Sequence, residues 1–466
     1  MTLWLHWWNA ISLLRPAFSR LRSFLWFATA VVGMTVRPDL LGVTSIVRAL
    51  SLKPVFYDRL LNHFHSAAVK PDALAALWTR LVLKLFPAPL RVNGRLVLVG
   101  DGIKAAKRGK KMPGVKLLHQ QSDSNKAEYI MGHSLQAICL LVQAAETVFA
   151  VPLAMRIHEG IVWSNRDQRT LLDKMLALIG IVGIADACYF VGDAYYASGK
   201  IINGLLEQDH HLVTRARSNA VAYRPFVAQQ GPKRRGRPKI YDKKVTLKTL
   251  FRDKSAMQEM VSPVYGETDV KLQYHLCDLL WRPARRLVRF VAVIHPTRGR
   301  CLLMCTDLTL SAADIIRLYG LRFKIEFTFK QAVNQIGTLA YHFWMQKMKP
   351  LKRRNGNQYM HREPLEYRDL VKRKLRAYHL FIQAGLIAQG LLQYLAVAFP
   401  QLVWDSFGSW LRTIRAGIPP SELVVATALR QRLPQFLLDN SEGNIFRKFI
   451  LDRQDKDKIE LFRMTA

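Results

Sequence analysis

The stretch Arg95-Leu-Val-Leu-Val-Gly-Asp101-Gly decides the fold, and it has a counterpart further along the chain in Cys188-Tyr-Phe-Val-Gly-Asp193. Each is an unbroken run of aliphatic or aromatic residues followed by glycine and aspartate. Such runs are typical of strands covered on both faces, and sites in such sheets form at strand ends. We therefore expect an α/β fold with a site that includes Asp101 and Asp193. The glycine before each acid is expected to let a metal ion or a phosphate approach the backbone closely.

More strands are expected around these two, at residues 114–118, 129–142, 147–157, 211–217 and 301–306. Helices are expected from Asn165, as the capping residue, to Val182, and from Tyr196 to Glu207. Between the core strands, a basic loop rich in glycine and proline precedes three partly alternating segments, at residues 244–251, 269–279 and 286–294. We interpret residues 218–296 as a β-rich insertion that divides the core into residues 91–217 and 297–400.

Both ends of the chain, residues 1–90 and 401–466, are predicted to be all-helical. Within the first, the sequence is typical of two short helices with a turn near Ser51 to Pro54. In a helix-turn-helix motif the second helix would enter a DNA groove, and an ordinary helical hairpin fits the sequence about as well. We expect residues 1–90 to be a helical DNA-binding region.

A third acid stands in the middle of a predicted helix. Ser311-Ala-Ala-Asp314 resembles a capping box, and Gly337 is a natural stop signal, so one helix is expected between them. Tyr319, Arg322 and Glu326 are spaced i, i+3, i+7 and would share one face of that helix. These side chains are odd for a core, but they suit a place beside a phosphate and a metal ion.

The charge balance indicates a polyanionic partner. Lysine and arginine number 69 against 34 acidic residues, which gives a formal net charge of +35 spread over the whole chain. A polyanion that shares the surface relieves self-repulsion of this size. Nucleic acid is the first candidate and an anionic membrane is the rival.

Two apolar stretches bear on the membrane alternative. Residues 24–36 are too short to span and lack a convincing cleavage site, whereas residues 377–404 are long enough. The longer stretch contains His379, Gln383, Gln389 and Gln393, and we interpret it as a buried core helix without a membrane. The five cysteines include no CxxC pair, so neither a zinc site nor a disulfide framework is indicated, and reduced buried thiols are expected.

Three clustered carboxylates in so basic a chain have a chemical use. Phosphodiester transfer needs an activated nucleophile and charge balance on the leaving oxygen. Two Mg²⁺ ions about 3.5–4 Å apart supply both, and carboxylates are suitable hard ligands for them. The acids would leave a negative hole in a positive surface, which metal ions would neutralise.

These motifs resemble those of the DDE-type transposases of bacterial insertion sequences, whose catalytic domain has the RNase H-like fold. Asp101 looks like the first aspartate of that family, Asp193 like the second and Glu326 like the final glutamate. The spacing Tyr319-x2-Arg322-x3-Glu326 is similar to the signature of one large subgroup, which also carries a β-rich insertion before the glutamate. The resemblance covers roughly residues 91–395.

The chain departs from that subgroup at two positions. Val333 stands where a lysine or arginine is expected, while Lys330 lies three residues earlier, and Phe323 stands where tryptophan is common. The resemblance implies that Tyr319 and Arg322 hold the DNA end near the scissile phosphate. Lys330, one turn beyond the glutamate, could serve the same strand.

Basic segments offer further DNA contacts. One loop after the first aspartate carries five cations: Lys104, Lys107, Arg108, Lys110 and Lys111. As a set beside a catalytic acid they are expected to meet phosphates, although any one of them could belong to a solvated loop. Arg235-Gly-Arg237-Pro-Lys239 resembles an AT-hook core, and a flexible basic linker fits equally well. A third basic set, expected to contact the DNA backbone, comprises Lys347, Lys349, Lys352, Arg353 and Arg354.

The resemblance implies metal-dependent cleavage at transposon ends and strand transfer into target DNA. Two Mg²⁺ ions, for which Mn²⁺ could substitute, would be held by Asp101, Asp193 and Glu326. Double-stranded DNA is the expected partner, a homodimer on DNA the expected working form, and the bacterial cytoplasm, with the nucleoid, the expected location. A DNA-binding protein that has lost catalysis and a nuclease of the same fold without strand transfer are the alternatives.

Overall fold

The computed structural model describes residues 2–120, 127–226, 239–352, 354–408, 414, 418–439, 444–455 and 457. Arg235, Arg237 and Arg353 therefore lie outside the described residues, as does most of the expected AT-hook. Lys239 of that motif is described. It is exposed and pairs with Asp242 at 3.0 Å.

The centre of the fold is a five-stranded sheet. β2 (Arg95–Ala106) pairs antiparallel with β4 (Tyr129–Ala144), and β4 pairs antiparallel with β5 (Thr147–Ile157). On its other side β2 pairs parallel with β7 (Cys188–Val191), which pairs parallel with β8 (His211–Arg215). Three antiparallel strands followed by two parallel ones form the expected RNase H-like core. Four short strands accompany it: β1 (Arg91–Val92), β3 (Lys116–His119) and the paired strands β6 (Ile161–Val162) and β15 (Gln358–Tyr359).

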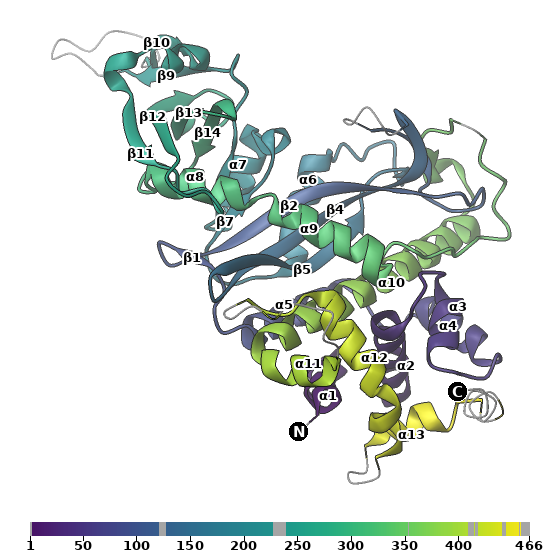
Figure 1. The fold of residues 1–466 in the computed structure, drawn as a ribbon. Coiled ribbons are helices and arrows are strands. Elements are labelled where there is room, and N and C mark those ends of the chain that lie inside the picture. Colours follow the sequence, from purple (N-terminus) through teal and green to yellow (C-terminus); the bar gives the residue numbers. More distant parts are fainter. Residues whose placement is uncertain are drawn as a thin grey trace.

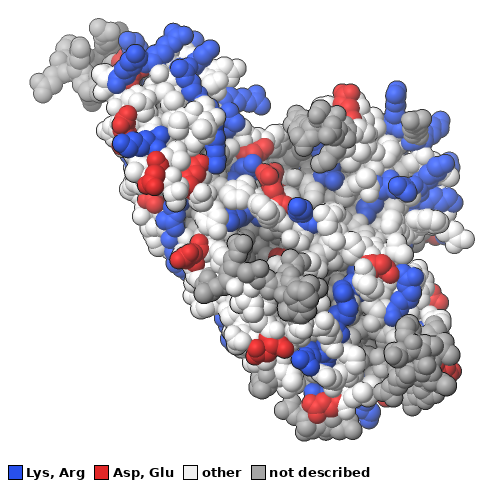
Figure 2. Space-filling model, viewed as in Figure 1, with Lys and Arg blue, Asp and Glu red and all other residues white. Residues whose placement is uncertain are grey.

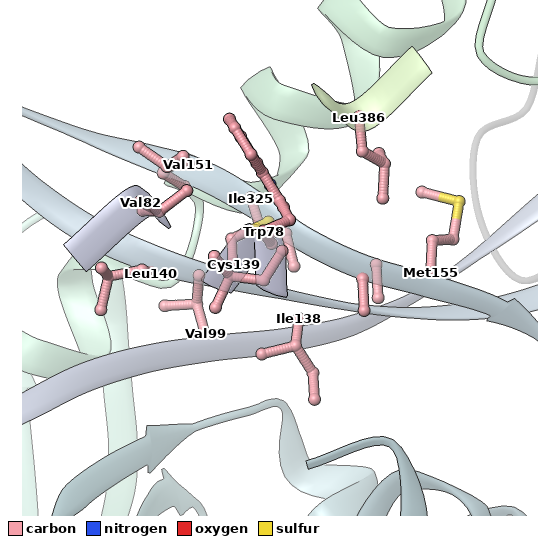
Figure 3. Close-up of a cluster of buried hydrophobic side chains, with 14 of the residues drawn as sticks. Trp78, Val82, Val99, Ile138, Cys139, Leu140, Val151, Met155, Ile325 and Leu386 are labelled. Carbon is pink, nitrogen blue, oxygen red and sulfur yellow. The ribbon is translucent and has the colours of Figure 1, made fainter. Parts of the chain in front are cut away.

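Helices cover both faces of this sheet, which explains the buried apolar runs in its strands. Val99 belongs to a buried cluster with Trp78 of α5 (Pro71–Leu85), Ile325 of α9 (Lys324–Gln331) and Leu386 of α10 (Leu365–Ala398), as Figure 3 shows. The next residue, Gly100, faces Met175 of α6 (Leu171–Val182) on the opposite side. α7 (Gly199–Leu206) packs beside α6. Alternation along β2 then places Asp101 on the face that α9 covers.

The insertion continues the core sheet instead of forming a separate one. β14 (Gly299–Cys305) pairs antiparallel with β8, and the sheet proceeds through β13 (Arg286–His295), β12 (Lys271–Trp281), β9 (Val221–Pro225) and β10 (Tyr241–Thr246). β11 (Gln258–Val261) also pairs with β12. Figure 1 shows this part reaching away from the helices, at the upper left. The expected β-rich character of the region is confirmed.

The helical regions at the two ends of the chain pack together. The first contains α1 (Leu3–Ser12), α2 (Leu21–Val36), α3 (Val43–Ala49) and α4 (Phe56–Phe64); the second contains α11 (Pro400–Phe407), α12 (Glu422–Leu438) and α13 (Ile445–Leu451). α12 packs against both α1 and α2, and Trp4 Nε1 donates to the carbonyl of Leu429 at 2.9 Å. The all-helical ends expected from sequence are confirmed, and they form one body around α10 (Figure 1).

α10 is the long apolar helix that raised the membrane alternative. Its length and composition would allow it to cross a membrane, but most of its apolar part is buried inside the protein. Its glutamines meet backbone carbonyls of neighbouring elements: Gln383 donates to Leu153 at 2.9 Å and Gln393 to Ala150 at 3.1 Å. The interpretation as a core helix is confirmed.

Two helix predictions need correction. The helix that ends at Val182 begins at Leu171, because Thr170 and Asp173 form a reciprocal capping box, and Asn165 does not cap it. The single helix expected from Ser311 to Gly337 is divided into α8 (Ala312–Leu321), α9 and a π-helical turn at Ala332–Ile336. The interruption falls at Arg322 and Phe323.

Candidate active site

Strand register brings the two aspartates together. Val99 of β2 pairs with Val191 of β7, and each aspartate lies two residues beyond its valine on parallel neighbouring strands. Asp101 stays within β2, and its Oδ1 accepts from the amide of Gly102 at 2.7 Å. Asp193 ends its strand and caps a 3-10 turn, accepting from the amide of Tyr195 at 3.1 Å.

Arg322 joins Asp101 to Glu326. Its Nη1 donates to Asp101 Oδ2 at 2.9 Å and its Nη2 to Glu326 Oε1 at 2.9 Å. The interruption between α8 and α9 places the guanidinium there: the amide of Arg322 donates to the carbonyl of Tyr319, as in a 3-10 turn, instead of one residue further back. One cation thus holds two carboxylates that are 225 positions apart in the sequence (326 − 101).

The electrostatics of the aspartates reflect their burial. Burial raises the pKa of Asp101 to about 6; the Gly102 amide and Arg322 oppose this rise, while the charges of Asp193 and Glu326 add to it. Burial also raises the pKa of Asp193, with the Tyr195 amide and Arg322 opposing. The ionised forms of both acids therefore gain from any further cation placed between them.

The three acids are chemically suited to bind a divalent cation, but their side chains are not grouped around one point in this structure. They supply hard oxygen atoms, and two of them already share one cationic partner. Nevertheless, across the described residues no three His, Cys, Asp or Glu side chains stand close enough to hold one ion as they are. The guanidinium of Arg322 fills the space between Asp101 and Glu326. Asp101 and Glu326 would be available to a divalent cation only if that guanidinium moved to another partner.

The glycines before the aspartates make room for aromatic rings beneath the site. A Cβ atom on Gly100 would collide with the ring of Phe190, and one on Gly192 would lie 2.7 Å from the ring of Tyr196. The close approach of a metal ion or phosphate to these glycines stays a prediction.

Tyr319 and Arg322 line a cavity of about 510 Å³ between α8 and the insertion. Its wall is strongly cationic, with Arg215, Arg298 and Arg300 contributing. Lys330 lies further along α9 and is exposed. α8 and the turn that joins it to α9 thus present basic and aromatic groups to a cavity large enough for part of a nucleotide.

The expected basic loop after Asp101 is only partly at the surface. Lys104, Arg108 and Lys110 are exposed and Lys111 is half-buried. Lys107, in contrast, is 5% exposed; its ammonium donates to the carbonyls of Leu339 and Tyr341, and burial lowers its pKa to about 7. Its assignment as a DNA contact is corrected here, because the side chain is used to hold the loop to the segment after α9.

A family model described as a transposase DDE domain matches residues 101–341, just over half of the chain. The chain belongs to the DDE transposase family. The match begins at Asp101 and contains Asp193 and Glu326, together with the core strands β4, β5, β7 and β8. None of the curated proteins compared with this transposase matches it.

Two features of the transposase escaped the sequence prediction. Thr214 on β8 donates to the backbone carbonyl of Asp193 at 2.6 Å, which fixes the end of β7. Trp344, beyond α9, is 66% exposed. A signal for Trp344 existed, because apolar residues alternate in orientation along the extended run Tyr341-His-Phe-Trp-Met345.

Proposed function

We propose that this transposase cleaves DNA at the ends of its element and joins the freed 3′-hydroxyls to target DNA. Asp101, Asp193 and Glu326 would hold two divalent cations, Mg²⁺ with Mn²⁺ able to substitute. The observation that carries the proposal is that Arg322 pairs with both Asp101 and Glu326, while Asp193 follows the strand beside Asp101, in a chain with 69 basic and 34 acidic residues. Carboxylates brought near one another are costly unless cations balance their charge.

Each residue has a separate task in the proposed reaction. When bound, the divalent cations supply charge stabilisation to the attacking and leaving oxygens. Asp101 and Asp193, anchored on neighbouring strands, fix the ligand positions, and Glu326 completes the set from α9. Tyr319 and Arg322, in the wall of the cationic cavity, hold the DNA strand so that the scissile phosphate lies in line with the nucleophile.

Arg322 changes partners in this scheme. Its guanidinium pairs with Asp101 and Glu326 in the free protein and with a DNA phosphate in the complex. Phosphate offers the same bidentate oxygen geometry as carboxylate, so the exchange keeps the charge-assisted hydrogen bonds. DNA binding would thereby free two carboxylates for the metal ions at the moment when the substrate arrives.

The DNA partner and the assembly follow from charge and chemistry. Exposed cations Lys104, Arg108, Lys110, Lys330 and Lys239 are proposed backbone contacts. Cleaving two ends of one element in a single event requires paired ends, so the working form is a homodimer on double-stranded DNA. We place the protein in the bacterial cytoplasm, with the nucleoid.

The test uses labelled DNA that carries the genomic flanks of the gene, together with a supercoiled plasmid and Mg²⁺. The proposal predicts nicking at the flank boundary followed by covalent joining of label to plasmid. Cleavage without joining would instead identify a nuclease of the same fold. Binding without either step would identify a DNA-binding protein that has lost catalysis, and the proposal would fail.

A further inference from the structure

Trp344 is an exposed aromatic residue on a segment that is otherwise buried. Among the described residues no large apolar side chain is more exposed, at 66%, whereas its neighbours Phe343 and Met345 are 4% and 5% exposed. Alternation along this extended segment directs residues 343 and 345 into the core and residue 344 outward. The exposure of Trp344 is therefore imposed by the fold around it.

The backbone is fixed on both sides of Trp344. The hydroxyl of Tyr378 donates to the carbonyl of Phe343 at 2.7 Å, and the amide of Met345 donates to the carbonyl of Lys111 at 2.9 Å. These bonds tie the segment to α10 on one side and to the loop after β2 on the other. An aromatic side chain held in this way loses little freedom when a ligand covers it.

The loop that touches Trp344 is cationic. A Cβ atom on Gly109 would lie 3.2 Å from Trp344 Nε1, so the turn between Arg108 and Lys110 lies directly against the indole. The carbonyl of Lys110 also accepts from the amide of Leu351 at 2.7 Å. Two stretches without acidic residues, 102–120 and 337–352, thus meet here.

We call this surface the basic ridge. It consists of Trp344 and the surrounding cations Arg108, Lys110, Lys111, Lys347, Lys349 and Lys352. Figure 2 shows lysine and arginine gathered at the right-hand edge of the molecule, where Figure 1 places the segment between α9 and α10. Lys347 of the ridge pairs with Glu366 at 2.7 Å, and both side chains are largely exposed.

We infer that the basic ridge binds double-stranded DNA at a point where one base has left the helical stack, and that Trp344 covers the exposed base. Cations spaced around an indole match a phosphate backbone on either side of a base, because the phosphates take the charges and the base takes the ring. A fully paired duplex would offer the ring no face to stack on. This inference rests on the proposed function only for the identity of the DNA.

The probe is a short duplex with a single-nucleotide 2-aminopurine bulge, compared with the same duplex without the bulge, in EDTA so that no cleavage occurs. Wild-type protein is expected to bind the bulged duplex about tenfold more tightly and to quench the 2-aminopurine fluorescence. Trp344→Ala should lose both the preference and the quenching. Trp344→Phe should keep most of each, because phenylalanine retains an aromatic face.

A matched cation variant separates stacking from charge. Lys349→Gln is expected to weaken binding of both duplexes equally and to reduce the slope of log affinity against log salt by about 1. If the folded Trp344→Ala protein, checked by circular dichroism, discriminates the bulge as well as wild type, the inference is wrong. If Trp344→Ala instead alters the oligomeric state and leaves discrimination intact, a second copy covers the indole and the inference is also wrong.

These outcomes are independent of the proposed function. Cleavage and joining with Mg²⁺, without any Trp344-dependent preference for the bulge, would remove this inference and leave the transposition proposal standing. A Trp344-dependent preference for the bulge in a protein that neither nicks nor joins DNA would leave this inference standing and remove the transposition proposal.

Discussion

The carboxylate site and the basic ridge concentrate charge of opposite sign in one molecule. At the site, Asp101, Asp193 and Glu326 gather negative charge in a very basic protein, and one arginine partly balances it. At the ridge, cations gather around Trp344 with few acids among them. In the proposals above, the site binds cations that arrive from solution and the ridge binds a polyanion. The comparison teaches that the two regions would take partners of opposite charge.

Removing one carboxylate should have the largest effect. Asp193→Asn keeps the size of the side chain but removes a charged metal ligand, so cleavage should fall by at least about 100-fold while DNA binding persists. Gel assays for nicking and for binding measure the two quantities on the same DNA.

The control for this variant is Asp186→Asn. Asp186 precedes the same strand and pairs with Arg91 in an exposed ion pair, which contributes little to stability. Its cleavage rate should stay close to wild type. A comparable loss of cleavage in both variants would contradict the assignment of Asp193 to the active site.

The pH dependence of metal binding should follow Asp101. Burial raises its pKa from 3.8 to about 6 in the folded protein, so the folded state holds this proton over a pH range in which the unfolded chain has lost it. Without metal, the contribution of Asp101 to stability therefore decreases as pH rises from about 4 to about 6, and it stays low above that range. Metal must displace the proton, so Mn²⁺ affinity should fall about tenfold per pH unit below pH 6.

Titration of Mn²⁺ by electron paramagnetic resonance across this pH range measures the effect. The comparison protein is Asp101→Asn, which lacks the titrating group and should bind Mn²⁺ weakly at every pH. A wild-type affinity that is flat between pH 5 and pH 7 would contradict the account.

The packing under the site predicts a stability effect. Gly100→Ala would push a methyl group against the ring of Phe190 and should lower the free energy of unfolding by about 1–3 kcal/mol. Gly180→Ala in α6 is the matched control, because no atom lies near its Cβ position. That change should be neutral or stabilise the protein by up to about 1 kcal/mol. Urea denaturation compares the two, and equal effects would refute the packing argument.

The smallest effect concerns Arg322. In the DNA-free protein its guanidinium competes with metal ions for Asp101 and Glu326, so Arg322→Gln should tighten Mn²⁺ binding by several-fold even as it weakens DNA cleavage. Arg48→Gln, which removes an exposed pair with Asp39, is the control and should leave Mn²⁺ affinity unchanged. Weaker Mn²⁺ binding in Arg322→Gln would show that the arginine does not exclude the metal.

The sequence was sufficient to predict the core strands and to name the three acids as candidates. Buried strands such as Cys188–Val191 leave an unbroken apolar run, and the glycine and aspartate that follow mark where the strand ends. The pairing of β2 with β7, which brings Asp101 beside Asp193, depends on long-range register. From the sequence alone, only the family resemblance indicated this pairing.

Other features could not be predicted because they depend on neighbours distant in sequence. The interruption of the helix at Arg322 leaves both cap signals, Ser311 and Gly337, unchanged. The burial of Lys107 depends on carbonyl groups more than 200 residues away in the sequence. The sequence does not distinguish a lysine that binds such carbonyls from one that binds phosphates. The role of Gly100 depends on a ring from β7.

The stoichiometry of Mn²⁺ bound to the DNA complex tests the central claim most directly. Wild-type protein with its end DNA should bind two Mn²⁺ ions per protomer, and Asp193→Asn should bind at most one at the same concentration. Equal stoichiometry in the two proteins, or no bound Mn²⁺ in the wild-type complex, would contradict the assignment of these carboxylates as metal ligands.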